Sequence, residues 1–595
     1  MYSDPILGVE IVSCKGYSSV SFFYLYQRFM TISLCKPYRA LFFACASLLT
    51  AALSISLASA EATTKIADES SSATLASEKM KLNNAPINLG VYREHAKTLA
   101  SNEFEGRGPL SKGEEKTVSY LVAQYKKLGL KPAFGESYTQ AVPLAKITPN
   151  NMSALTIGDL TFKAGAEFTA RTQRIAKDYS LNSSDVIFVG YGINAPEYNW
   201  NDYARINVKG KTVVMLVNDP GFASKDPALF QGNAMTYYGR WTYKYEEAAR
   251  QGAEAVFIVH ETMPAGYGWG VVENSNSNTK FSLVDEENNA SQVGVMGWLH
   301  LNAARQLFEK AGLDYGELKE KASKPGFTPI ELKAKASLSF TNTIEHAESQ
   351  NVAGILEGTT KPDEWVMLHA HWDHLGKVEK NGQTTIYNGA VDNASGVAGV
   401  LTLADALTKA EKHFSRTLMF SAFTAEETGL LGADFFANNP PISTSKMVAF
   451  LNIDGMNVND GVDYILQYGE GYLSIEDDLA NAAALQGRTV KMDPRPQNGL
   501  FFRSDHFALA KQGVPSILFM SLGDTDPSFI TKRYHKADDD YLTSWTLGGV
   551  EQDLSLIGSM LTYYAQGDVW PYWKRESDFK AKRLQSLSSR ETSAK

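Results

Sequence analysis

A repeated strand–loop–helix pattern in the C-terminal part of the chain constrains its fold more than any other feature. From about residue 350, short apolar runs alternate with helical segments. The predicted strands cover 366–368, 417–423, 447–453 and 515–519, and the predicted helices cover 396–409, 432–438 and 545–564. This alternation is typical of an α/β fold with a mostly parallel mixed sheet flanked by helices. In such sheets, ligands bind beyond the carboxyl ends of the strands.

A β-rich insertion is predicted over residues 161–345. Its apolar runs at 186–189 and 212–217 are bounded by Gly, Asn and Pro, and a predicted helix over 245–252 leads into a strand over 255–259. The α/β domain is therefore predicted in two parts, which cover 87–160 and 346–570. In the first part, Ser111 is expected to cap a helix that ends before Gly129. We expect a polar, disordered tail over 571–595.

The first sixty residues predict an export signal. Lys36 and Arg39 precede the apolar run 40–57, which ends in Ala58-Ser59-Ala60. This order is typical of a secretory signal peptide, so we expect segment 1–60 to be removed after Ala60 and the protein to be periplasmic or extracellular. We also expect translation to start at Met30, and a flexible lead-in over 61–86. The alternative is a retained membrane anchor, but about 18 residues is the lower edge for a span and this run contains Ser and Thr.

The positions of the cysteines and the net charge restrict the possible metal ligands and binding partners. All three cysteines, Cys14, Cys35 and Cys45, lie in the segment that we expect to be cleaved. An exported chain without further cysteine has no disulfides and no thiolate ligands, so His, Asp and Glu must hold any metal ion. The formal net charge of −9 argues against nucleic acid as a partner. Without its signal, the chain is expected to make no stable membrane insertion.

Histidines and carboxylates gather where the predicted strands end. Residues 369–374 follow one strand, Glu426-Glu427 follow the next, and Asp454 follows the third. Asp392 precedes a predicted helix, and His535 lies nearer the C-terminus. Such a set without cysteine suits zinc or another divalent ion, and one further carboxylate supplies the base that hydrolysis needs. The sequence therefore predicts a metal-dependent hydrolase.

These segments together resemble the signature series of the co-catalytic zinc aminopeptidases, family 28 of the metallopeptidases, which also includes glutamate carboxypeptidase. The matching segments are His371-Trp372-Asp373, Asp392-Asn393-Ala394-Ser395-Gly396, Glu426-Glu427-Thr428-Gly429-Leu430-Leu431-Gly432, Asn452-Ile453-Asp454 and His535-Lys536-Ala537-Asp538-Asp539. The resemblance covers roughly residues 88–570. It implies the zinc-exopeptidase fold, with a protease-associated domain as the insertion.

The resemblance also implies a role for each residue of the site. Two zinc ions are expected, with cobalt or manganese as alternatives. The implied ligands are His371 and Asp454 for one ion, Glu427 and His535 for the other, and Asp392 as the bridge, with a cis peptide bond to Asn393. Asp373 would orient His371, and Glu426 would be the general base. The choice of His371 over His369 and His374 depends on the His-x-Asp spacing.

The implied function is that of a secreted aminopeptidase that acts on peptides. A carboxypeptidase that removes a C-terminal acidic residue is the alternative, and it would require basic residues in the specificity pocket. A single-metal glutaminyl cyclase and a non-catalytic, transferrin-receptor-like binding protein are disfavoured, because all five ligands and the base are present. Arg503 or His506 as a substrate contact, and Tyr534 as an oxyanion donor, stay open. The residue preference and the oligomeric state are also left open.

Overall fold

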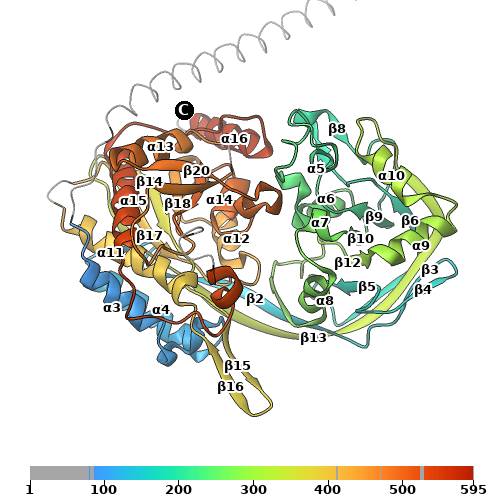
Figure 1. Ribbon diagram of the computed structural model, residues 1–595, viewed down its shortest axis with the longest axis horizontal. Coiled ribbons are helices and arrows are strands. Elements are labelled where there is room, and N and C mark those ends of the chain that lie inside the picture. The colour runs from blue at the N-terminus through green and yellow to red at the C-terminus, as the bar shows by residue number, and fades with distance from the viewer. Residues whose placement is uncertain (1–79, 81–85, 411–412, 470, 523–527, 594–595) are drawn as a thin grey trace, which may run out of the picture. The chain divides into compact units, whose positions relative to one another are not determined.

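The computed structural model describes residues 80, 86–410, 413–469, 471–522 and 528–593 (Figure 1). The predicted signal peptide, the start at Met30 and nearly all of the lead-in lie outside the described residues. Among the helices in the described ranges, none combines the length and the apolar character that a bilayer span requires.

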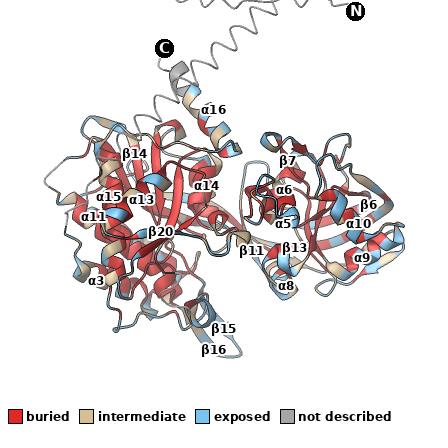
Figure 2. Cartoon of the chain, turned by 45° about the horizontal axis from the view of Figure 1, so that its top comes forward, coloured by how far each residue is buried: buried red, intermediate tan, exposed pale blue. Residues whose placement is uncertain are grey.

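The predicted α/β alternation is confirmed. Strand β14 (Lys361–His369) lies between β17 (Arg416–Ala422) and β18 (Met447–Asn452) and runs parallel to both, and β21 (Ser516–Met520) continues the parallel set beyond β18. The sheet is mixed, because β19 (Tyr464–Tyr468) pairs antiparallel with β21. Its central strands are largely buried (Figure 2). This burial is expected where helices cover both faces of a parallel sheet.

Alternate side chains of β14 enter two separate apolar clusters. Val366 and Leu368 belong to a cluster that includes residues of α11 (Gly396–Thr408) and α15 (Gly548–Gln566). Trp365 and Met367 belong to another, with residues of α12 (Leu431–Asn438) and α14 (His506–Lys511). The sheet is therefore the middle layer of three, and only its strand ends are free to present polar side chains.

The N-terminal helix prediction is also confirmed. Helix α4 covers Lys112–Lys127, and the Ser111 side chain accepts hydrogen bonds from the N–H groups of Gly113 and Glu114. Gly129 follows the C-terminal cap with a φ of +73°, a conformation that glycine adopts without steric cost. Helix α3 (Leu89–Leu99) precedes it.

The inserted segment contains a second set of parallel strands, which β13 links to the strands of the α/β domain. Strands β6 (Asp178–Phe188), β9 (Thr212–Leu216), β10 (Ala255–His260) and β12 (Val295–His300) lie in that order. Helix α6 (Trp241–Arg250) contributes to an apolar cluster that is built only from residues between 187 and 298. The predicted strands and helix of this segment are thus confirmed, and the segment has a core of its own.

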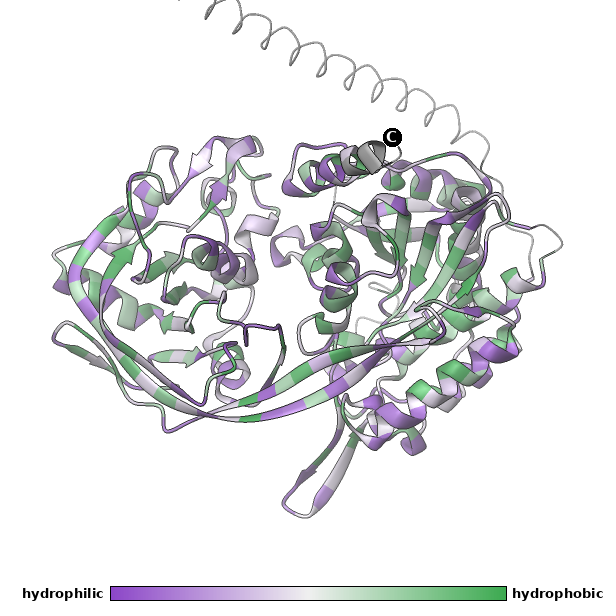
Figure 3. Ribbon diagram, turned by 180° about the vertical axis from the view of Figure 1, so that it is seen from behind, coloured by the Kyte–Doolittle hydropathy of each residue, from purple (hydrophilic) through white to green (hydrophobic). Residues whose placement is uncertain are grey.

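The predicted boundary between residues 345 and 346 falls inside a single strand. Strand β13 runs from Ile330 to Leu356 without interruption, and β2 (Thr139–Asn150) pairs antiparallel with it (Figure 1). Both strands alternate between hydrophobic and hydrophilic residues (Figure 3). The insertion is therefore continuous with the α/β domain through a two-stranded ribbon rather than joined to it by flexible linkers.

The expected disorder of the C-terminal tail is wrong for residues 578–593, which form helix α16 (Asp578–Ser593). Phe579 is 3% exposed, and Arg583 donates hydrogen bonds to the carbonyls of Thr444 and Met447. Trp573, just before the helix, is also buried. A few anchoring side chains hold the segment although its composition is polar.

The remaining elements are short or peripheral. The strands are β1 (Lys131–Pro132), β3 (Leu155–Ile157), β4 (Leu160–Phe162), β5 (Phe168–Arg171), β7 (Asn194–Ala195), β8 (Trp200–Asn201), β11 (Lys280–Leu283), β15 (Gly376–Lys380), β16 (Gln383–Tyr387) and β20 (Thr489–Met492). The α-helices are α5 (Pro220–Ser224), α7 (Thr262–Ala265), α8 (Trp269–Ser277), α9 (Leu301–Lys310), α10 (Tyr315–Ala322) and α13 (Ile475–Leu485).

Candidate metal centre

The structure brings all five predicted ligands together at the carboxyl ends of the parallel strands. His371 follows β14, Asp454 follows β18, and Asp392 lies just before α11. His371 Nε2 lies 3.3 Å from Asp454 Oδ1 and 3.4 Å from Asp392 Oδ1. These three side chains form one group of nitrogen and oxygen donors.

A second group shares the same aspartate. His535 Nε2 lies 3.2 Å from Asp392 Oδ2 and 3.0 Å from Glu427 Oε2. Asp392 thus presents one oxygen to each histidine, which is the arrangement that a bridging carboxylate requires. The peptide bond from Asp392 to Asn393 is cis, as the resemblance implies.

His374 is a further neighbour that the sequence prediction set aside. Its Nδ1 lies 2.6 Å from Glu427 Oε1, and its donor atoms cluster with those of Asp392 and Glu427. The His-x-Asp spacing gave no reason to choose it. His369, in contrast, points away from the centre, since its Nε2 lies 2.8 Å from Asp505 Oδ2 in a fully buried pair.

Asp373 contacts His371, as expected for a residue that orients it, and also holds the turn that carries the two glutamates. Its backbone carbonyl, and not its carboxylate, is the nearer partner of His371 Nδ1, at 3.0 Å against 3.7 Å. The carboxylate also accepts hydrogen bonds from the N–H groups of Glu426 (3.0 Å) and Glu427 (3.3 Å). Asp373 therefore fixes the turn that carries both glutamates.

Glu426 lies at the edge of the first donor group. Its Oε2 is 4.0 Å from His371 Nε2, which is farther than the oxygens of Asp392 and Asp454. Burial raises the pKa of the Glu426 carboxyl well above its ordinary value, and the charge on His371 opposes this effect. The position is close to the predicted ligands without being the nearest donor, which suits a general base.

The donors fit a divalent cation. Four carboxylates, those of Asp392, Glu426, Glu427 and Asp454, converge with imidazoles at one buried place. Burial alone would lower the pKa of His535, but its hydrogen bonds to Asp392 and Glu427 raise that pKa to about 10. Concentrated negative charge of this kind is stabilised by bound cations, and nitrogen and oxygen donors without sulfur suit zinc and its neighbours.

Two residues that the sequence analysis did not single out hold the ligand loops in place. Arg107 is fully buried and donates hydrogen bonds to four backbone carbonyls, those of Leu99, Trp372, Asn388 and Gly389. Asp539 accepts hydrogen bonds from the N–H groups of Val391 and Asp392 and pairs with Arg533. A charge-assisted network of this kind orients ligands before a metal ion binds.

The three residues with open roles have different environments. His506 is fully buried, and its ring nitrogens have no hydrogen-bond partner among the described residues. Tyr534 is 42% exposed and its ring stacks on His535, with the centroids 3.9 Å apart. It is therefore accessible beside the centre. Arg503 is half-buried on the loop before α14.

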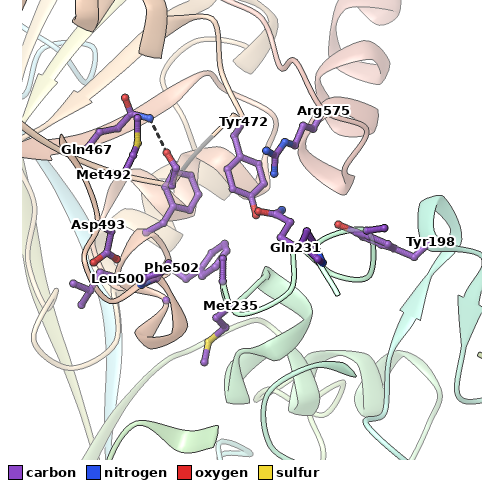
Figure 4. A pocket seen from close by; sticks show the side chains of 17 residues that line it. Tyr198, Gln231, Met235, Gln467, Tyr472, Met492, Asp493, Leu500, Phe502 and Arg575 are labelled. Atoms are coloured by element: carbon purple, nitrogen blue, oxygen red, sulfur yellow. Dashed lines mark hydrogen bonds between the residues drawn. The ribbon is translucent and has the colours of Figure 1, made fainter. Parts of the chain in front are cut away.

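A separate pocket of about 440 Å³ lies between the inserted segment and the C-terminal part of the chain. Figure 4 shows Tyr198, Gln231 and Met235 on one side, with Tyr472 and Arg575 among the residues opposite. The Gln231 amide donates a hydrogen bond to the Tyr472 hydroxyl (2.7 Å). None of the predicted metal ligands lines this pocket, so it is distinct from the candidate centre.

The fold and the donor set define a protein with a carboxylate–imidazole metal centre at the edge of a mixed α/β sheet. Residues 351–551 match the model of Peptidase family M28, and this range contains every predicted site residue. This match covers 201 of the 595 residues of the chain.

Relatives with assigned names are similar over short stretches. A probable glutamate carboxypeptidase LAMP1 of Arabidopsis thaliana is 33% identical over 122 residues, which cover 20% of this chain and 16% of that protein. Aminopeptidase NAALADL1 of Mus musculus is 31% identical over 141 residues, which cover 22% of this chain and 17% of that protein. The matched stretch thus spans about a sixth of the length of each relative.

A solved structure, an aminopeptidase from Aneurinibacillus sp. strain AM-1, matches over 81% of this chain and 95% of its own. The sequence identity is 21% and the TM-score is 0.45.

Proposed function

We propose that this protein is a zinc-dependent exopeptidase that removes N-terminal residues from peptides. The observation that carries the proposal is the shared aspartate, because Asp392 presents one oxygen to His371 and the other to His535. The family match over residues 351–551 supports the same class of enzyme.

Two zinc ions are proposed for each chain. His371 and Asp454 would hold one ion, Glu427 and His535 would hold the other, and Asp392 would bind both; cobalt and manganese suit the same donors. Bound zinc would supply the charge that makes water a nucleophile at neutral pH and polarises the scissile carbonyl.

Glu426 is proposed to carry the proton. Its carboxylate accepts a proton from the attacking water as the new C–O bond forms, and it donates that proton to the leaving amine as the C–N bond breaks. Asp373 keeps the carboxylate in place, because it accepts the N–H groups of Glu426 and Glu427. The turn thus positions the base.

The N-terminal end of the substrate is the proposed site of cleavage, in line with the aminopeptidase resemblance. The similar relatives include both an aminopeptidase and a carboxypeptidase. The identity of the released residue therefore distinguishes the two activities. We expect mass spectrometry of a digested pentapeptide to show stepwise loss of N-terminal residues, and N-acetylation to abolish that loss. Release of the C-terminal residue from the acetylated pentapeptide would instead establish a carboxypeptidase.

Export is proposed from the signal-like segment that ends at Ala60. The support is the basic, apolar and small-residue order of residues 36–60. N-terminal sequencing of the protein from the periplasm or medium is expected to begin at Glu61. A mature chain that retains residues 40–57 would contradict cleavage.

A further inference from the structure

Two arginines that have no anionic partner among the described residues lie where the inserted segment meets the α/β domain. Arg240 immediately precedes α6, and Arg503 lies on the loop before α14. Arg240 is 8% exposed, and the Nε atoms of both arginines are buried without a hydrogen-bond partner. Among the described residues, neither side chain forms an ion pair or a side-chain hydrogen bond. Both guanidinium groups are thus left with unused donors.

The two positive charges act on each other. Burial lowers the pKa of Arg240 to about 9, and the charge on Arg503 acts in the same direction. Burial raises the pKa of the Tyr267 hydroxyl, and the charges on both arginines oppose this effect. Asp493 is a carboxylate near enough to Arg503 to interact electrostatically, but the two form no ion pair. Because unpaired buried charges destabilise a fold, an anion between the two guanidinium groups would relieve a clear penalty.

The loop that carries Arg503 is anchored at the edge of the sheet that holds the candidate metal centre. Ser504 Oγ accepts a hydrogen bond from Asn452 (2.6 Å) at the end of β18, and Asp505 lies 2.8 Å from His369 at the end of β14. These two strands lead directly into predicted metal ligands. Arg503 therefore extends from a loop held next to the centre.

The segment that carries Arg240 contacts the same loop region. The Met235 N–H donates a hydrogen bond to the Pro496 carbonyl (3.1 Å), and the ring centroids of Tyr237 and Phe502 are 6.2 Å apart. Met235 and Phe502 also line the pocket shown in Figure 4. Each arginine thus comes from a different part of the chain, and both parts are held together beside the site.

We propose that Arg240 and Arg503 bind a carboxylate of the peptide substrate. A planar guanidinium offers paired N–H donors that match the two oxygens of a carboxylate, so two arginines make a strong and selective site. The proposal rests on the proposed exopeptidase function and narrows its substrates to short peptides whose carboxylate reaches the pair. That carboxylate comes either from the free C-terminus or from an acidic side chain.

The test compares matched probes with the purified wild-type enzyme and with Arg240→Gln and Arg503→Gln. The first pair of probes is leucyl-glycine and its amide, and the second is leucyl-glutamate amide and leucyl-glutamine amide. In wild type, we expect kcat/KM to favour the carboxylate probe of at least one pair by about tenfold or more, as charge-assisted hydrogen bonds imply. In either variant the preference is expected to fall to about twofold or less, mainly through KM. Preference in the first pair identifies the C-terminus, and preference in the second identifies the side chain.

Exposed arginines from the same two regions provide the controls. Arg305→Gln and Arg495→Gln are expected to keep the carboxylate preference. Leucine anilide, which has no carboxylate, tests the proposed function separately. If the wild type cleaves the anilide but shows no preference in either pair, or if Arg240→Gln or Arg503→Gln keeps the preference, the carboxylate site is overturned while the exopeptidase stands. Failure to cleave the anilide and all peptides overturns both.

Thermal unfolding separates binding from a structural role. Because Arg240→Gln removes one of two unpaired like charges, its melting temperature without substrate is expected to equal or exceed that of wild type. Arg240→Lys keeps the charge but not the paired donors, so it is expected to retain only part of the preference. A large drop in melting temperature, together with equal losses on all probes, would show that Arg240 is structural and would overturn the proposal.

Discussion

Arg107 connects segments that are far apart in the sequence but adjacent at the candidate metal centre. Its guanidinium donates to the carbonyl of Trp372, beside the ligand His371, and to the carbonyls of Asn388 and Gly389, which precede the ligand Asp392. The loops that carry two of the predicted ligands therefore depend on one buried side chain. Its loss would leave several buried carbonyls without partners.

We expect Arg107→Met to lower the free energy of unfolding by at least about 3 kcal/mol, because each unsatisfied buried carbonyl costs about 1–3 kcal/mol. Chemical denaturation measures the change. Arg93→Met is the matched control, since Arg93 donates one hydrogen bond, to the carbonyl of Trp545, and should cost about 1 kcal/mol. Equal effects of the two substitutions would contradict the role given to Arg107.

Asp539 leads to a prediction about metal affinity rather than stability. Its carboxylate accepts the N–H groups of Val391 and Asp392, so Asp539→Asn would loosen the bridging ligand. We expect zinc affinity, measured by competition with a chelator, to fall about 10–100-fold. Asp538→Asn, at the exposed neighbouring position, should leave affinity unchanged. If both variants bind zinc as wild type does, Asp539 does not position the centre.

The convergence of the candidate ligands can be predicted from sequence, whereas the residues that position them cannot. His371, Glu427 and Asp454 each lie two to five residues beyond the end of an apolar strand, so their convergence is a consequence of parallel strands ending at one edge. Arg107 and Asp539 act through hydrogen bonds to backbone groups of distant loops. Any buried arginine has the same sequence signature, so only the folded arrangement reveals its partners.

At the scale of elements, α16 shows how few contacts hold a polar segment in place. Its composition predicts disorder, because polar residues outnumber apolar ones in the segment. The buried side chains of Trp573 and Phe579, and the Arg583 hydrogen bonds to two carbonyls, override that tendency. The average composition of a segment does not reveal a few individual side chains that become buried, so it does not predict this helix.

Phe579→Ala is expected to destabilise the protein by about 3 kcal/mol, since it removes a buried aromatic side chain. Leu584→Ala, on the same helix, is the control, because Leu584 is 45% exposed and its loss should stay within about 0.5 kcal/mol. Denaturant titration of both variants gives the comparison. A Phe579→Ala protein as stable as wild type would mean that α16 contributes nothing to the fold.

Strands and helices with clear periodicity were predictable, but their continuity was not. The runs at 212–217 and 255–259 match β9 and β10, because β-branched residues bounded by turn residues act locally. Strand β13 runs through residue 345, where a domain boundary was expected. Its pairing with β2 spans a separation of many residues, and such pairing leaves no local signal.

For the molecule as a whole, we expect bound metal to stabilise the fold. Removing zinc leaves four carboxylates crowded with imidazoles, and a ligand that binds only the folded state stabilises it by about 2.7 kcal/mol at 100 times its dissociation constant. The melting temperature should therefore fall on dialysis against a chelator and recover on addition of zinc. Calcium is the control, because its preference for oxygen ligands makes it a poorer match. An identical melting temperature in all states would contradict a metal centre.

Metal content and turnover, measured in the same samples of wild type, Glu426→Gln and Glu427→Gln, test the proposed metal centre and its general base together. For wild type, we expect two zinc ions per chain and hydrolysis of leucine anilide. We expect retained zinc but a fall in kcat of about 10²–10⁴-fold for Glu426→Gln, and loss of zinc for Glu427→Gln. Wild-type protein that binds no metal, or Glu426→Gln protein with full activity, would contradict the proposed metal centre and its general base.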